Sequence, residues 1–231
     1  EVRPEGVDRA RRRLRRAVDQ DEAHLVGDLG GGSLELVELK HDEIGRGQTL
    51  PLGGIRLQEA SDGKIARAQK LADDALSGVE WLPIGSDKTF YAVGGTWRSL
   101  ARLHLHQNGY PLHVMHDYCI EAEEAIEFCQ HVARRDPDSL DMIDVVSRAR
   151  RQLLPFGATV MEKVLRRTKS ARVVMSAMGL REGLLYDLMP EDTRRLDPLV
   201  AAARELSILR ARSPDYGEEL IAWTDRIFPA V

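Results

Sequence analysis

The sequence has few cysteines, few aromatic residues and no long apolar run. Its two cysteines, Cys119 and Cys129, are too few for a disulfide framework, and no Cys-x-x-Cys or Cys/His cluster indicates a zinc site. No apolar run approaches the roughly 18 residues that a membrane span needs, and the first twenty residues are charged where a signal peptide would be apolar. We therefore expect a cytoplasmic protein with two buried cysteines and no membrane partner.

The charge balance also lacks a large positive field. The 231 residues carry 33 lysines and arginines against 37 aspartates and glutamates, a net charge of −4. A chain of this balance is not expected to attract nucleic acid. Six arginines fall between Arg9 and Arg16, and we interpret residues 1–23 as a basic linker or frayed remnant with a solvated surface.

Hydrophobic periodicity predicts an α/β domain followed by helices. Residues 24–50 are typical of a β-meander, and strands are predicted at 89–93 and 172–178. Helical spacing and stop signals predict helices at 65–76, 97–107, 122–135, 155–167, 180–188, 199–211 and 218–228. This order favours a mixed sheet flanked by helices over residues 24–190, and the beginning of a helical C-terminal domain at 197–231.

A run of three glycines joins the first two predicted strands. Gly30, Gly31 and Gly32 let the backbone take positive φ angles, so that successive N–H groups can converge on an anionic oxygen, and Ser33 adds a hydroxyl donor. The sequence therefore predicts a phosphate-binding turn. A loose hairpin with solvated side chains is the alternative.

Two carboxylates flank this turn. Asp28 ends the preceding strand, and alternation along the next strand places Ser33 and Glu35 on one side and Leu34 on the other, toward the core. Hard oxygen ligands of this kind suit a hydrated Mg²⁺ carried by phosphates. Asp28 and Glu35 are thus the candidate metal ligands and catalytic carboxylates.

Other candidate motifs give weaker signals. Gly94, Gly95 and Thr96 lead from a buried strand into a helix, where free N–H groups can bind a phosphate or Thr96 can simply cap the helix. His113 and His116 are three residues apart, but no acidic or cysteine partner stands at ligand spacing, which disfavours a metal site. Neither a Gly-x-Ser-x-Gly elbow nor a Walker A motif is present.

The ordered motifs resemble those of the exopolyphosphatase / guanosine pentaphosphate phosphohydrolase (Ppx/GppA) family, within the actin and sugar-kinase-like superfamily. The segment Asp28–Val37 is similar to the family's second phosphate motif, and the resemblance covers about residues 24–190. Further similar segments follow in the family's order: Leu50–Gly53, Val93–Arg98, Tyr110–His113, Leu154–Ala158 and Ser176–Leu184.

The resemblance implies an actin-like ATPase (ribonuclease H-like) fold and a hydrolase that releases terminal phosphate from inorganic polyphosphate or guanosine pentaphosphate. It implies that Asp28 and Glu35 position Mg²⁺ and water, that Gly30 to Ser33 hold the phosphoryl group, and that Gly94 to Thr96 line the same cleft. The implied partners are these phosphate compounds, with no nucleic acid and no membrane. A homodimer remains open.

The sequence departs from the family pattern upstream of the match. The catalytic glutamate of the family lies in a Ser-Gly-Glu-Glu-Ala-like segment, whereas this chain has its arginine-rich stretch there, and Glu5 lacks the surrounding pattern. Two alternatives therefore stay open. One is a catalytically silent polyphosphate- or nucleotide-binding module, and the other is a kinase of the same superfamily with an adenosine pocket near Gly179.

Without an identifiable glutamate base, the 231 residues alone are expected to hydrolyse little or no polyphosphate. A phosphate-release assay with polyphosphate and Mg²⁺ measures this directly. Turnover like that of a full-length exopolyphosphatase would contradict the expectation.

Overall fold

The computed structural model describes residues 23–40, 43–112, 114–136, 139, 143–210, 213 and 215–227. The arginine-rich stretch from Arg9 to Arg16, Glu5 and His113 lie outside these residues. The chain divides into two compact units, of which the larger runs from Asp21 to Glu182 and the smaller includes Gly183–Val231. Each unit is described by itself.

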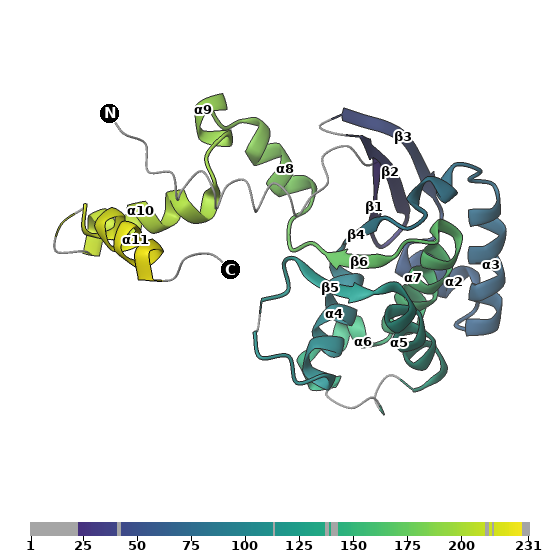
Figure 1. Ribbon diagram of the computed structural model, residues 1–231. Coiled ribbons are helices and arrows are strands. Elements are labelled where there is room, and N and C mark those ends of the chain that lie inside the picture. The colour runs from purple at the N-terminus through teal and green to yellow at the C-terminus, as the bar shows by residue number, and fades with distance from the viewer. Residues whose placement is uncertain are drawn as a thin grey trace. The chain divides into compact units, whose positions relative to one another are not determined.

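A six-stranded mixed sheet forms the centre of the larger unit (Figure 1). Its strands are β1 (Ala23–Leu29), β2 (Leu34–Lys40), β3 (Glu43–Leu50), β4 (Thr89–Val93), β5 (Tyr118–Glu121) and β6 (Arg172–Met175). They lie in the order β3-β2-β1-β4-β6-β5. Strands β1, β4 and β6 are parallel, whereas β2, β3 and β5 pair antiparallel to their neighbours. The predicted meander and the mixed sheet are confirmed.

One face of the sheet is apolar and covered by helices. Side chains of alternate residues point to this face, and their pairing partners across the strands are buried with them. The buried set includes Leu25, Leu29, Leu34, Leu36, Phe90, Ala92, Val173 and Met175. The opposite face carries partly exposed residues, among them Asp28, Glu35 and Tyr91. The predicted orientation of Leu34 toward the core, with Glu35 on the other side, is confirmed.

The helices of the larger unit match most predictions. They are α2 (Gly54–Ala60), α3 (Ile65–Ser77), α4 (Gly95–Gln107), α5 (Ala122–Arg134), α6 (Arg148–Arg151) and α7 (Leu154–Thr168), with 3-10 turns at Leu82–Gly85 and Ile143–Val145. The sequence did not predict α2, α6 or β5, because each is short and begins beside glycine or polar residues that weaken its periodicity. Cys129 is buried as expected, but the expectation for Cys119 is wrong: it is exposed on β5.

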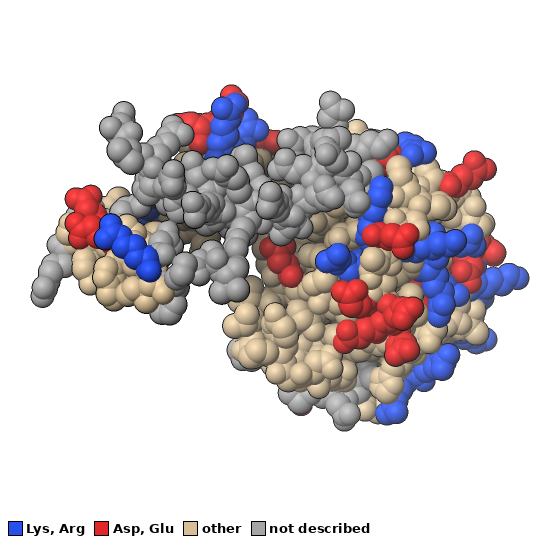
Figure 2. Space-filling model, viewed as in Figure 1, with Lys and Arg blue, Asp and Glu red and all other residues tan. Residues whose placement is uncertain are grey.

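Charged side chains of both signs lie close together on one face of the larger unit. Lys and Arg lie beside Asp and Glu over part of the visible face, and an area of uncharged residues adjoins them (Figure 2). Ion pairs such as Lys163 Nζ with Asp73 Oδ2, at 2.8 Å, link neighbouring helices there. A lysine or arginine that has no acidic partner therefore helps to identify a place where an anion could bind.

Glycines let α4 approach β1 and α7 closely. Gly94 has a φ of 114°, and a Cβ at this position would overlap the carbonyl oxygen of Leu29. A Cβ at Gly157 on α7 would overlap the methyl group of Thr96. The Trp97 indole Nε1–H donates to the carbonyl of Gly157 at 3.0 Å, and this pair is buried. The start of α4 is thereby fixed against both elements.

The smaller unit contains helices only in its described part. After α8 (Leu180–Asp187), which spans the boundary, come α9 (Glu191–Arg194), α10 (Pro198–Arg210) and α11 (Tyr216–Ile227). The helices predicted at 199–211 and 218–228 are confirmed. Residues of α10 such as Leu199, Ile208 and Leu209 are exposed. None of the helices in the described ranges combines the length and apolar character of a membrane crossing.

The substitution Gly94→Ala is expected to lower the free energy of unfolding by more than about 3 kcal/mol, because the new Cβ meets both a strained φ and the Leu29 carbonyl. Gly109→Ala is the matched control, since Gly109 has a φ of 59° but open space around a Cβ. Its cost should be about 1–2 kcal/mol. Denaturant unfolding measures both, and equal losses would contradict the role of the Leu29 contact.

Candidate functional site

Three glycine-containing turns meet at one edge of the sheet. Strands β1, β4 and β6 are parallel neighbours, so their carboxyl ends lie at the same edge. Residues 30–33 follow β1, residues 94–96 follow β4, and residues 176–179 follow β6. We call this region the carboxyl edge. It brings together the turn of residues 30–33, the acids Asp28 and Glu35 beside it, and residues 94–96.

The turn of residues 30–33 is supported from behind by α2. The Gly30 N–H donates to the Ser33 carbonyl at 2.9 Å. The Gly30 carbonyl accepts from the Gly54 N–H at 3.1 Å, and the Gly31 carbonyl accepts from Ile55 and Arg56. The carbonyl groups therefore point toward α2. Within the described part of the chain, the N–H groups of Gly31, Gly32 and Ser33 have no hydrogen-bond partner.

The expected positive φ angles are not found in this turn. The glycines with positive φ among the described residues are Gly63, Gly94 and Gly109. A Cβ at Gly32 would meet no atom within 4 Å, and one at Gly31 would meet only the flexible end of Ile55, at 3.2 Å. The turn reaches its shape with ordinary φ angles because hydrogen bonds to α2 fix it. Neither φ nor packing within the protein requires glycine at position 32.

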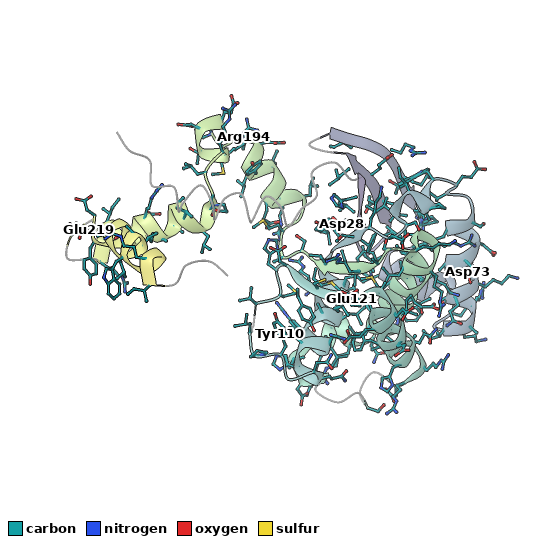
Figure 3. All side chains as sticks on the ribbon, in the orientation of Figure 1. Asp28, Asp73, Tyr110, Glu121, Arg194 and Glu219 are labelled. Atoms are coloured by element: carbon teal, nitrogen blue, oxygen red, sulfur yellow. The ribbon has the colours of Figure 1, made fainter. Side chains whose placement is uncertain are left out.

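Asp28 and Glu35 face each other across the first two strands. They are directly paired in the register of β1 and β2, so both side chains lie on the sheet face opposite the helices (Figure 3 labels Asp28). Both residues are half-buried. The Ser33 hydroxyl donates to Glu35 Oε1 at 2.5 Å, which orients the Glu35 carboxylate. In this structure the Ser33 hydroxyl is thus hydrogen-bonded to the adjacent Glu35 carboxylate.

The environment disfavours the charge on Asp28. Partial burial raises the pKa of the Asp28 carboxyl, and the nearby Glu35 carboxylate raises it further. The positive charge of Arg98 acts in the opposite direction, but the net shift of the pKa is upward. Two acids held together in this way attract a cation.

Two arginines at the carboxyl edge were not predicted as site residues. Arg98 on α4 donates from Nη1 to the Ala177 carbonyl at 3.1 Å, which links the second and third turns. The Arg150 guanidinium lies close to Gly95, since a Cβ there would be 3.3 Å from its Cζ atom. In the described ranges Arg150 has no acidic partner. Arg98 stands within a motif, whereas no sequence signal marks Arg150.

The second turn, residues 94–96, contributes backbone groups more than side chains to the carboxyl edge. Gly94 is the N-cap of α4, so the expectation that Thr96 caps this helix is wrong. Thr96 is buried within the first turn of α4, where its methyl group packs on Gly157. Because Gly94 and Gly95 have no side chains, the backbone at the start of α4 lies close to the carboxyl edge.

The third turn is closed by its own hydrogen bonds. The Met178 N–H donates to Ser176 Oγ at 3.1 Å, and the Gly179 N–H donates to Glu182 Oε2 at 2.8 Å. The Gly179 N–H lowers the pKa of the Glu182 carboxyl, with help from Arg181 and Arg98. The Glu182 carboxylate therefore already accepts the hydrogen bond of the Gly179 N–H, which a ligand at this turn would otherwise accept.

Two carboxylates at the carboxyl edge are the candidate metal ligands. Among the described residues, no group of three or more His, Cys, Asp or Glu side chains could hold an ion. His116 Nδ1 accepts from the Ala177 N–H at 3.3 Å, and its proposed neighbour His113 lies outside the described residues. Asp28 and Glu35 remain as the pair that could share a cation.

Comparisons with known proteins agree on one family. Residues 10–192 match the sequence model of the Ppx/GppA phosphatase family. The chain is 28% identical to Retrograde regulation protein 2 of Saccharomyces cerevisiae, and the match covers 78% of this chain and 35% of the yeast protein.

Solved structures share the fold. The Aquifex aeolicus Ppx/GppA phosphatase superposes with a TM-score of 0.61 and 22% identity, covering 77% of this chain and 60% of that one. An exopolyphosphatase from Cytophaga hutchinsonii gives a TM-score of 0.63 and 19% identity, covering 73% and 57%. The chain thus spans about a third of the yeast relative and under two thirds of these structures. The expected actin-like fold is confirmed.

Asp28→Asn is expected to raise the unfolding temperature at pH 7. The native environment raises the Asp28 pKa above its unfolded value of 3.8, so the charge destabilises the native state above the native pKa. Below the pKa of the unfolded state the carboxyl is protonated in both states, so this penalty is absent. The gain in unfolding temperature should therefore vanish as the pH falls from the native pKa to the unfolded pKa. Thermal unfolding from pH 3 to 8 measures it, with Asp74→Asn on the exposed side of α3 as control. A gain that did not depend on pH would contradict the assignment.

Proposed function

Because the chain belongs to the Ppx/GppA phosphatase family, we propose that it binds the terminal phosphoryl group of a phosphoric anhydride at residues 30–33 and takes part in its hydrolysis. The substrates that we propose are inorganic polyphosphate and guanosine pentaphosphate. One observation carries the proposal: Gly32 is an exposed glycine that neither φ nor packing requires. Close approach of a ligand to the backbone is a physical reason for the absence of a side chain at such a position, here beside unpaired N–H groups.

The unpaired amides of this turn supply the binding groups. The N–H groups of Gly31, Gly32 and Ser33 have no partner within the described residues, while the carbonyls of Gly30 and Gly31 accept hydrogen bonds from α2. Backbone N–H groups of this kind donate to phosphate oxygens, and turning the carbonyls away removes their repulsion of an anion. The turn is therefore organised for an anionic oxygen before the ligand arrives.

The positive charges at the edge support the same ligand. The guanidinium of Arg150 lies near the first turn of α4, whose partial charge is also positive. Two positive groups without an acid between them repel each other, and a bound phosphate would relieve this repulsion. Arg98 places a further positive charge near Asp28. Together these groups can stabilise the charge that spreads over the phosphoryl oxygens during transfer.

A magnesium ion fits the two carboxylates. Mg²⁺ in phosphate enzymes is bound by one or two carboxylates, and water and substrate oxygens complete its octahedron. Asp28 and Glu35 are paired across β1 and β2, and both are half-buried. A positive ion beside them would offset the repulsion between their two negative charges. When bound, the ion would neutralise phosphate charge. Ser33 would keep Glu35 oriented through its hydroxyl hydrogen bond.

The proposed reaction consumes one water. The water oxygen forms a bond to the terminal phosphorus, and the bond from that phosphorus to the bridging oxygen breaks with its electron pair left on the bridging oxygen. One water proton stays on the orthophosphate, the other passes to the bridging oxygen or to solvent, and orthophosphate and the shortened chain are released. The carboxylates of Asp28 and Glu35 would orient this water by accepting its hydrogen bonds. Arg98, which Ala177 holds in place, would bind oxygen of the transferring group.

A second candidate function is binding without turnover. The yeast protein that this chain resembles is named as a regulator, Retrograde regulation protein 2. The turn and its arginines would then recognise a polyphosphate as a signal. Binding and hydrolysis measured on the same preparation separate the two functions.

Gly32→Ala is expected to abolish or weaken polyphosphate binding at least tenfold, because the Cβ takes the space of the approaching phosphate. The fold should not suffer, since the site is open, and stability should stay level or rise by about 0.4–1 kcal/mol. Calorimetric titration with a short polyphosphate and Mg²⁺, together with thermal unfolding, measures both effects.

Gly78→Ala provides the matched control. Gly78 is exposed at the C-terminal cap of α3, has a negative φ, and would place its Cβ in ordinary contact at 3.8 Å. This variant should bind polyphosphate as the unmodified chain does. Unchanged binding by Gly32→Ala would remove the turn from the proposed site.

A further inference from the structure

The Ser33 hydroxyl combines two chemical features at the turn of residues 30–33. Its Oγ donates to Glu35 Oε1 at 2.5 Å, a distance at the short end for a hydroxyl and a carboxylate. Its own backbone N–H is one of the unpaired amides of the turn. Only Cα and Cβ stand between Oγ and this nitrogen, so a phosphoryl group bound to the turn lies within contact range of Oγ. A nucleophile and its base therefore lie beside the proposed phosphate.

The approach to this hydroxyl is open, and its base is held by the sheet. A Cβ at Gly32, the residue before Ser33, would meet no atom within 4 Å. Ser33 and Glu35 are half-buried. The strand register pairs Glu35 with Asp28 on β1 and with Thr49 on β3. Strand pairing on both sides therefore fixes the backbone of Glu35 beside the turn.

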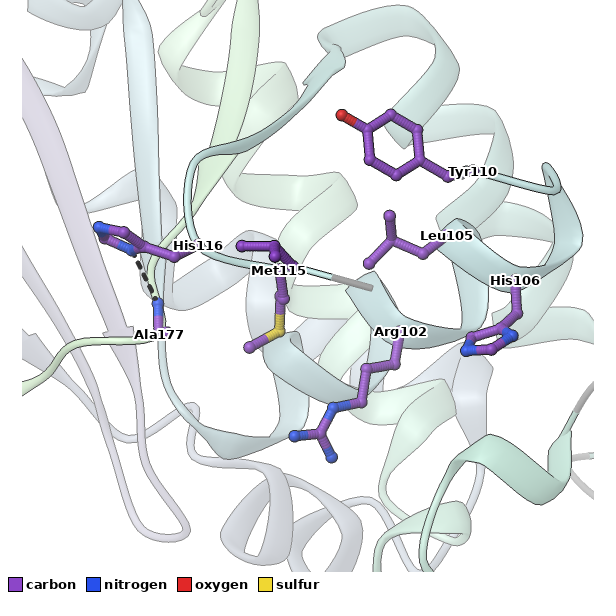
Figure 4. A pocket seen from close by; sticks show the side chains of 8 residues that line it. Arg102, Leu105, His106, Tyr110, Met115, His116 and Ala177 are labelled. Carbon is purple, nitrogen blue, oxygen red and sulfur yellow. Dashed lines mark hydrogen bonds between the residues drawn. The ribbon is translucent and has the colours of Figure 1, made fainter. Parts of the chain in front are cut away.

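Two other hydroxyl groups have only part of this combination. Ser86 Oγ donates to Asp87 Oδ2 at 3.4 Å, but Ser86 precedes β4 and lies at the opposite end of that strand from the carboxyl edge. A cavity of about 420 Å³ between α4 and the segment before β5 is lined by Arg102 and Tyr110 but by no Asp or Glu (Figure 4). The Tyr110 hydroxyl shares this cavity with a positive charge, but no carboxylate there can accept its proton. These two hydroxyls are internal comparisons for Ser33.

We propose that Ser33 accepts the terminal phosphoryl group of a phosphoric anhydride, so that the chain phosphorylates itself at this residue. The inference rests on the proposed function, since the phosphoryl group must first bind at residues 30–33. The Ser33 hydroxyl and water then compete for the same group.

The transfer is a displacement at the terminal phosphorus. Ser33 Oγ forms a bond to this phosphorus, and the bond from the phosphorus to the bridging oxygen breaks with its electron pair left on the bridging oxygen. The Oγ proton passes to Glu35 Oε1, from which it is released to solvent. The products are phosphoserine and a phosphate chain that is shorter by one phosphate.

A phosphate on Ser33 would close the site to further substrate. Its oxygens can accept from the N–H groups of Gly31 and Gly32, which an incoming phosphate would otherwise use. Its negative charge would lie beside Asp28 and Glu35, where it repels a second polyphosphate. The phosphorylated chain is therefore a self-inhibited form of the protein.

Intact-mass measurement of the full 231-residue chain, incubated with a short polyphosphate and Mg²⁺, tests the transfer. We expect a mass gain of one HPO₃ group, and peptide mapping should place it on Ser33. Ser33→Ala should lose this gain, and Ser33→Thr should retain it because threonine keeps the hydroxyl. Ser86→Ala is the matched control and should gain mass as the unmodified chain does. Phosphate on Ser86 or Tyr110 in place of Ser33 would overturn the inference.

Glu35→Gln tests the base. The carboxamide keeps the size of the side chain but cannot take the Oγ proton, so the mass gain should slow by about a hundredfold or more. The rates are compared at polyphosphate concentrations that saturate each variant, so that weaker binding does not enter the comparison. A rate equal to that of the unmodified chain would overturn the role of Glu35.

Calorimetric binding of polyphosphate to the same preparations separates this inference from the proposed function. Binding without a mass gain would overturn the transfer to Ser33 but not phosphate binding at the turn, and the absence of both would overturn both. Gly32→Ala should lose the mass gain together with binding. A gain at the unmodified rate in this variant would place the reacting phosphate away from the turn.

The phosphorylated chain itself tests the self-inhibition. After its separation from the unmodified chain, it should bind polyphosphate about tenfold more weakly or less. Equal binding by the two forms would contradict the closure of the site.

Discussion

The close approach of α4 to β1 and α7 determines where the whole carboxyl edge lies. Gly94 allows the start of α4 to reach the Leu29 carbonyl, and Gly157 allows Thr96 and Trp97 to pack on α7. A side chain at either glycine would push the helix outward. The start of α4 would then move away from the end of β1, and Arg98 would lose Ala177.

The arrangement of charge at this edge fits the proposed ligand. Asp28 carries a raised pKa beside Glu35, and Arg150 lies near the positive end of α4 without an acid beside it. The charge on Asp28 is costly in the free protein, since burial removes water from it and the Glu35 charge repels it, whereas Arg150 is exposed. A bound phosphate would pair with Arg150, and the cation that it carries would pair with Asp28 and Glu35. Local departures of this kind concentrate at functional sites.

Much of the fold followed from pattern alone, and the failures have physical reasons. Strands β1 and β2 and the helices α3 and α5 have clear periodicity because one face of each is buried, whereas α7 is buried on most of its sides and β3 is mostly exposed. Helix α2 begins at Gly54, and β5 is four residues long, so neither has enough residues to show a period. Position 119 alternates outward on β5, which is why Cys119 is exposed despite its apolar character.

The sequence by itself determined the turn of residues 30–33, the position of Asp28 and Glu35 beside it, and the family, because these depend on neighbours along the chain. Only the tertiary structure decided that the glycines keep negative φ, since hydrogen bonds from α2 shape the turn. It also decided that Thr96 is buried and that Arg150 reaches Gly95, 55 positions away. Contacts between distant segments follow from packing, and no local pattern encodes them.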